Sequence, residues 1–225
     1  MNIEIHHRPS YAMAVVDLEP GETVVAESGA MISMDSHIRI ETSAGMSQGL
    51  LKGLKRMVAG ESFFQNKFTA EGGPGHVTFA PTFVGDVAQT ELSSSKLFIQ
   101  STSFLCSGTG VDIDAKWGGA KTFFGGEGLI MLKAEGTGPV VFNSFGAIKE
   151  IDVDGEFIVD TGHIVAFEES LNFNVSRFGG SWKSFIFGGE GLVCRFTGSG
   201  KLWIQTRNPQ EFGESIGPLL PMREN

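Results

Sequence analysis

One pentapeptide occurs twice in this chain, and its repetition limits what the chain can fold into. The letters GGEGL fill positions 125–129 and again 188–192. A looser version, GESF, begins at Gly60, so that Glu61, Glu127 and Glu190 mark three similarly spaced positions. Self-similarity at a regular spacing is the signature of a structural unit copied along a chain. We therefore expect three tandem units.

Two further landmarks recur with the same order. An opening stretch, VDLEPGE at 16–22, is matched by IDVDGE at 151–156, and TELSSSK at 90–96 occupies the same place between them. After each opening, apolar and polar residues alternate with a period of two, which predicts a half-buried strand. These alternating stretches lie at 32–41, 111–114 and 171–176.

Glycine-rich stretches at 71–75, 135–139 and 197–200 predict the turn of a closing hairpin in each unit. The 31 glycines against 8 prolines suit many short strands joined by tight turns. The expected fold class is all-β, with three tandem β-sandwich repeats in a pseudo-threefold arrangement. The expected repeat units are 1–85, 86–146 and 147–225, the last with a C-terminal tail.

The motifs that would carry chemistry are missing from the sequence. Neither GGEGL is followed by the Lys-Ser/Thr pair of a phosphate-binding loop, and a carboxylate within the glycines would repel phosphate. The five histidines lack the spacings of metal ligands, and no G-x-S-x-G elbow exists. Residues 150–155 resemble half of a calcium loop, but Thr161 stands where a bidentate glutamate is required. We expect no catalytic residue, no metal and no cofactor.

Net charge and cysteine usage limit the partners and the cellular compartment to be expected for the protein. The formal charge of −9 opposes sequence-independent binding of nucleic acid. The start of the chain lacks the layout of a signal peptide, and no apolar run is long enough to span a membrane. Cys106 and Cys194 lie alone in apolar, strand-like segments. We expect a cytoplasmic protein with buried thiols, a disulfide between the two being the alternative.

A connection that mixes basic and apolar residues precedes each GE turn, at 49–60, 117–126 and 178–189. If the first is helical, its leucines share one face and its basic residues the other. Two interpretations are open: packing in the core or a subunit contact, and contact with a membrane surface. The hypothetical interaction surface consists of Leu50, Leu54, Lys55, Arg56, Trp117, Lys121, Phe123, Phe124, Trp182, Lys183, Phe185 and Phe187.

Several of these stretches together resemble the altered-inheritance-of-mitochondria 24 family. The resemblance rests on SGAMISMD at 28–35, GLLKGLKRMVAGES at 49–62, FFGGEGL with its echo IFGGEGL, and IQTRNPQEF before PLLP. It implies three units like those of the tryptophan RNA-binding attenuator protein, related to the double-stranded β-helix. It also implies an often oligomeric protein without an established enzymatic activity or recognised catalytic residues.

Three functional hypotheses follow. The first is a non-catalytic, self-associating interaction or scaffold module, a homo-oligomer that contacts a protein partner or a membrane surface. The second is a small-ligand binder or cryptic enzyme with a pocket between units, near His37, Arg39 or Asp112. The third is RNA binding, which the acidic balance disfavours.

Overall fold

The computed structural model describes residues 1–44, 64–115, 123–124, 129–177 and 192–221. Within these ranges the backbone is predominantly antiparallel β-structure, with one short α-helix near the C-terminus. The prediction of an all-β fold is confirmed.

The first group of strands, within residues 2–79, consists of two long segments that are each divided in two. The opening segment is β2 (Met13–Leu18) and β3 (Thr23–Glu27), and its partner is β6 (Phe64–Ala70) and β7 (Gly75–Phe79). β2 pairs with β7, and β3 with β6. Three further strands flank these pairs: β1 (Asn2–His6) on β2, β4 (Met31–Met34) on β7, and β5 (Ile38–Ala44) on β6.

The second group, residues 87–143, has undivided long strands. β8 (Val87–Gln100) pairs with β12 (Leu129–Asn143) over almost its whole length. A 3-10 turn, η1 (Ser101–Ser103), leads from β8 to the next strand. The short strands β9 (Phe104–Gly108), β10 (Val111–Asp114) and β11 (Phe123–Phe124) all pair with β12.

The third group, residues 148–205, is built in the same order. β13 (Ile148–Asp160) pairs with β16 (Leu192–Gln205) from end to end. η3 (Thr161–His163) follows β13, and the side chain of Asp160 caps it by accepting a hydrogen bond from the Gly162 amide. β14 (Ile164–Glu168) and β15 (Leu171–Arg177) then pair with β16.

One short strand in each group carries an interruption of its ladder. Where β4 pairs with β7, β9 with β12 and β14 with β16, the register skips a single residue, as in a β-bulge. The skipped residues are Ile32, Leu105 and Val165. Each skip lies one residue after the strand begins.

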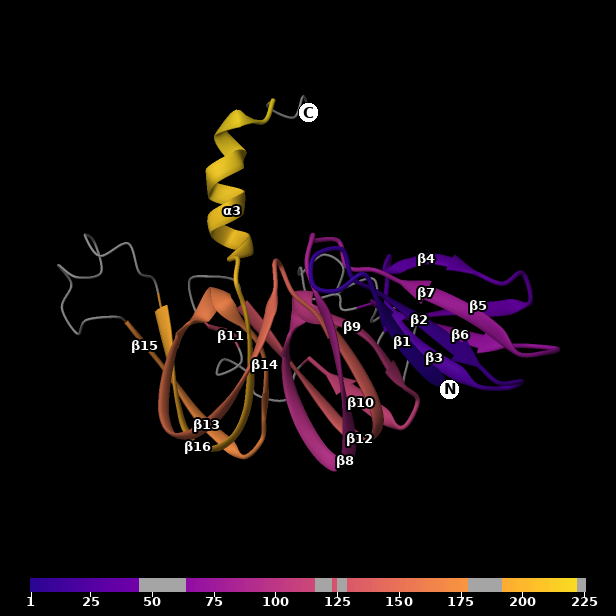
Figure 1. The fold of residues 1–225 in the computed structure, drawn as a ribbon, viewed down its shortest axis with the longest axis horizontal. Coiled ribbons are helices and arrows are strands. Elements are labelled where there is room, and N and C mark those ends of the chain that lie inside the picture. Colours follow the sequence, from indigo (N-terminus) through magenta and orange to yellow (C-terminus); the bar gives the residue numbers. More distant parts are fainter. Residues whose placement is uncertain (45–63, 116–122, 125–128, 178–191, 222–225) are drawn as a thin grey trace.

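The groups are joined edge to edge by β-ladders. β3 of the first group pairs antiparallel with β9 of the second, and β8 of the second pairs antiparallel with β14 of the third. The sheet thus continues from one group to the next. Figure 1 shows the strands spread along the longest axis of the molecule, with β4 and β5 at one end and β13, β15 and β16 at the other.

The connections between groups also lie side by side. Gly85 and Gly146 form an isolated parallel bridge, and the Ser144 amide donates to the carbonyl oxygen of Asp86. An ideal Cβ on Gly85 would lie 1.9 Å from the Ser144 carbonyl oxygen, so this approach of the two backbones requires glycine.

Buried apolar residues form three clusters, one within each group with small contributions from its neighbour. The largest enclosed side chains are phenylalanines, among them Phe68, Phe142 and Phe196. Cys106 and Cys194 are free and buried, which confirms the prediction of buried thiols.

The C-terminal helix α3 (Pro209–Ile216) stands away from the sheets (Figure 1). Asn208 caps its N-terminus by accepting from the Gln210 amide. The ring of Phe212 packs against Phe145, 5.0 Å between centroids, and Phe145 packs against Phe83. These rings attach the base of the helix to the connections between groups.

All three predicted hairpin turns are wrong. Residues 135–139 and 197–200 do not reverse the chain: they lie inside β12 and β16, opposite β8 and β13. Gly136 and Gly198 have φ angles of 137° and 120°. Here the positive φ lies within a long strand. Residues 71–75 connect β6 to β7, but these strands pair with β3 and β2 and not with each other, so this stretch is not a hairpin turn either.

The alternating stretch at 32–41 is not one strand. It is divided into β4 and β5, because the backbone turns between them, where the Ile38 amide donates to the Asp35 carbonyl oxygen. Its counterparts at 111–114 and 171–176 lie in β10 and β15, as the alternation predicts.

Candidate interaction site

Most of the predicted interaction surface lies outside the described residues. This holds for Leu50, Leu54, Lys55, Arg56, Trp117, Lys121, Trp182, Lys183, Phe185 and Phe187. Phe123 and Phe124 form β11, whose backbone pairs with Ile130 and Leu129 of β12. The surface stays a prediction.

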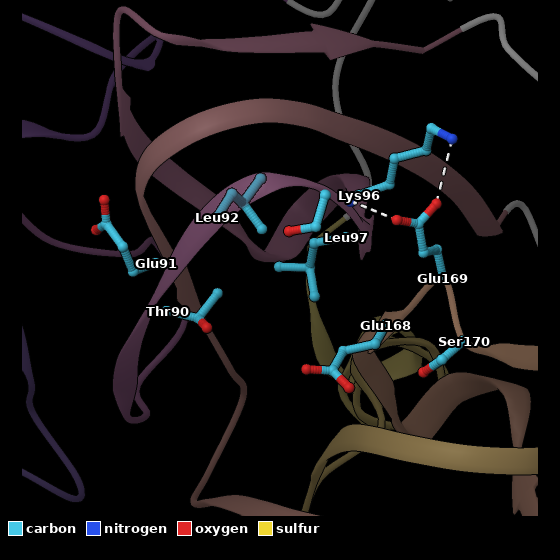
Figure 2. Close-up of a pocket in the computed structure, with 9 residues that line it drawn as sticks. Thr90, Glu91, Leu92, Lys96, Leu97, Glu168, Glu169 and Ser170 are labelled. Carbon is cyan, nitrogen blue, oxygen red and sulfur yellow. Dashed lines mark hydrogen bonds and ion pairs between the residues drawn. The ribbon is translucent and has the colours of Figure 1, made fainter.

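A cleft of about 220 Å³ lies where β8 meets β14, at the junction of the second and third groups. Figure 2 shows the side chains around it. Thr90, Glu91, Leu92, Lys96 and Leu97 come from β8. On the other side, Glu168 is the last residue of β14, and Glu169 and Ser170 follow it. Thus the lining is acidic, with a single lysine.

Two carboxylates of this cleft accept hydrogen bonds from the protein, and that of Glu169 joins the two groups across the junction. Glu169 accepts from both the backbone amide and the ammonium group of Lys96, each at 3.2 Å, as Figure 2 shows. Glu168 accepts from the Lys201 amide at 2.8 Å. Glu168 and Glu169 therefore already have donors, and Glu91 is the third carboxylate of the lining.

The residues named for a pocket between units do not come together. His37 lies beside the Pro74 carbonyl oxygen, 2.9 Å away, and Arg39 forms ion pairs with Glu71 and Glu41. Asp112 lies on β10 of the second group, which Figure 1 shows well separated from β5. No common site is formed by these three residues.

Sequence reasoning missed an exposed Asp-His-Asp cluster in the first group. His76 lies 3.0 Å from Asp35 through Nδ1 and 3.3 Å from Asp17 through Nε2. The hydrogen bond to Asp35 raises the pKa of His76 and lowers that of Asp35. Asp17 and His76 face each other across β2 and β7, a pairing that could be found only once the strand register was known. Among the described residues no group suited to holding a metal ion is found.

Several edge strands of the described residues expose apolar side chains, among them β4 and β13. At one end of the molecule β4 exposes all four of its residues, and Ile32 is 55% accessible. At the other end β13 exposes Phe157 and Ile158, the latter 45% accessible. Within the described residues β4 pairs only with β7, and β13 only with β16. Such edges are open to pairing with another chain.

The fold defines a class: an all-β protein whose groups of strands join edge to edge, with β4 and β13 as edge strands within the described part of the chain. A sequence model of the family described as "Mitochondrial biogenesis AIM24" matches residues 3–207. The chain therefore belongs to the AIM24 family, as the resemblance predicted.

Two relatives come from Streptococcus pyogenes. An uncharacterised protein of serotype M6 is 30% identical over 233 residues, which cover 100% of this chain and 93% of the relative. A protein solved by X-ray crystallography is similar to this chain with a TM-score of 0.81 and 27% identity, covering 97% of this chain and 99% of that one. Within the described residues, no helix is both long and apolar enough to cross a membrane.

Proposed function

We propose that this protein is a non-catalytic scaffold of three tandem repeats, 1–85, 86–146 and 147–225, which associates with further copies of itself and with a protein partner. The observation that carries the proposal is the shared pairing of the three groups of strands. Each has a long opening segment, a strand with a skipped residue, a second short strand and a long closing segment. The likeness to attenuator-protein units and the pseudo-threefold arrangement remain predictions.

The junctions between groups support a scaffold. Repeat proteins whose units contact mainly their neighbours build extended surfaces, and such surfaces serve for binding. The β3–β9 and β14–β8 ladders support an array of that kind for this chain. Its terminal strands β4 and β13 carry exposed apolar residues of the sort that mark contact sites.

The absence of catalysis belongs to the same proposal. Two of the three carboxylates in the β8/β14 cleft, Glu168 and Glu169, already accept hydrogen bonds from structural donors. The buried, free thiols of Cys106 and Cys194 suit the reducing cytoplasm, which is the location we propose.

Sedimentation velocity of the purified chain over a wide range of concentrations tests the proposal. We expect species larger than one chain whose proportion grows with concentration. A protein that sediments as a monomer throughout would contradict self-association. Flotation with liposomes, run in parallel, tests whether the protein also contacts a membrane surface. Only a membrane-peripheral protein is expected to move with the vesicles.

A further inference from the structure

The two internal junctions use the same strands in the same register. In each, the second half of a long opening segment pairs with the strand that carries the skipped residue in the next group. The pairs are Val24–Gly108, Val25–Ser107 and Ala26–Cys106 at the first junction, and Leu97–Glu168, Phe98–Phe167 and Ile99–Ala166 at the second. The structure therefore contains two copies of one joint.

At one end of the molecule, a strand equivalent to one side of the joint lacks the strand that would pair with it. β4 is the strand with the skipped residue in the first group, and no preceding group covers it. Its skipped residue Ile32 is 55% accessible, whereas the equivalent Leu105 and Val165 are completely buried at the internal junctions. Ile32 is thus equivalent to two buried apolar residues of the joints but is itself exposed.

The opposite end has the complementary feature. Phe157 lies opposite Phe196 on the closing strand of its group, just as Leu97 lies opposite Ala134 and Val24 opposite Phe68. By this register, residues 157–159 of β13 correspond to 24–26 and 97–99. Val24 and Leu97 are buried in their joints, but Phe157 is exposed.

We propose that β13 of one copy pairs antiparallel with β4 of a second copy and so repeats the internal joint between chains. Transfer of the register places Ile158 opposite Met34, Val159 opposite Ser33, and Phe157 opposite Asp35. The two edges lie at opposite ends of the longest axis (Figure 1), so one molecule in this form cannot pair them with each other. This inference rests on the proposed self-association and specifies its surface.

The charged groups beside these edges have partners within their own copy. Arg195 pairs with Glu156 next to the β13 edge, and His76 pairs with Asp35 next to the β4 edge. An association of unlike edges is head-to-tail, so it gives a ring if the rotation closes and a filament if it does not. Added strands of this kind gain affinity from backbone hydrogen bonds and specificity from side-chain pockets.

Two charge variants test the joint. Ile158→Lys and Met34→Glu each place a charge in the proposed ladder, and both side chains are exposed in the single chain, so that folding should be retained and checked by circular dichroism. Each variant alone should be monomeric in sizing with light scattering. A mixture of the two should assemble again, because the unaltered β13 of the Met34→Glu chain can pair with the unaltered β4 of the Ile158→Lys chain, and at the other joint lysine faces glutamate across the strands. Val84→Lys, at an exposed apolar residue away from both edges, should assemble like the wild type.

Cysteine pairs provide a second test that adds no charge. A mixture of Met34→Cys and Ile158→Cys chains should give an interchain disulfide under mild oxidation, while Tyr11→Cys with Ile158→Cys should not. Assembly that persists in both charge variants would overturn the joint and leave the proposed self-association standing. A monomeric wild type would overturn both. The register would be overturned if the single charge variants were monomeric, their mixture did not assemble, and the mixture of the two cysteine variants did not cross-link.

Discussion

Arg8 donates two hydrogen bonds to Asp86, from Nε to Oδ1 at 2.8 Å and from Nη2 to Oδ2 at 2.9 Å. The Asp86 side chain is almost wholly buried, while that of Arg8 is half exposed. Asp86 also accepts from the Val87 amide. The pair therefore ties the loop after β1 to the start of the second group.

Replacement of Arg8 by Ala should destabilise the protein by about 1–3 kcal/mol, because it leaves a buried carboxylate without its charged partner. Urea denaturation measures the change in the free energy of unfolding. Asp86→Asn in the same background should recover part of the loss. Arg39→Ala, which breaks exposed ion pairs only, should change stability much less than Arg8→Ala. Equal effects of the two arginine variants would contradict this account.

Glu27 gives the protein a pH dependence. Burial at the end of β3 raises the pKa of Glu27 to about 7, from an ordinary value of 4.5. The folded state then binds the proton more tightly than the unfolded state, so the contribution of Glu27 to stability is present below about pH 4.5 and is lost as the pH rises to about 7.

Glu27→Gln should remove this loss. We expect the variant to be more stable than the wild type by about 1–3 kcal/mol at pH 8 and nearly equal to it at pH 4.5. Denaturation curves at both pH values provide the measurement, with Glu211→Gln on the exposed helix α3 as the control. A stability difference that is the same at both pH values would show that Glu27 does not titrate in this range.

Gly85→Ala should disturb the contact between the two connections. Its Cβ would lie 1.9 Å from the Ser144 carbonyl oxygen and 2.8 Å from that of Gly146, and both are backbone atoms that cannot move alone. We expect a loss of about 2–4 kcal/mol, seen as a lower Tm. Gly213→Ala in α3, whose added methyl group meets nothing within 4 Å, should raise stability by less than about 1 kcal/mol.

The thiols should be inert in the folded protein. Burial raises the pKa of Cys194 to about 12 and that of Cys106 further still. Since the thiolate is the reactive form, a thiol reagent added at pH 8 should modify neither cysteine until denaturant is added, when both react. Rapid labelling of the native protein would contradict the burial of these side chains.

The sequence was informative where a local pattern determines the structure. Alternation at 111–114 and 171–176 predicted strands, and the isolated apolar setting of Cys106 and Cys194 predicted buried thiols. The same reasoning failed for Gly136 and Gly198, since a positive φ is required both in a turn and in a bend of a strand. The long ladders with β8 and β13 decide between the two, and those ladders are not local.

The candidate joint could not be found from the sequence for a related reason. Ile32, Leu105 and Val165 are all apolar and occupy the same position in their strands, yet one is exposed and two are buried. The difference depends on whether a neighbouring group covers the strand. Neither composition nor periodicity contains that information.

Because the three groups share one pairing scheme, each strand with a skipped residue is also an acceptable partner for the wrong long strand during folding. Exchange of equivalent elements within or between chains is the characteristic error of such arrays. We expect the connections around the Gly85–Gly146 bridge to limit this exchange, since they hold successive groups close together. Correct assembly of the chain thus depends on two short stretches that themselves contribute almost nothing to its sheets.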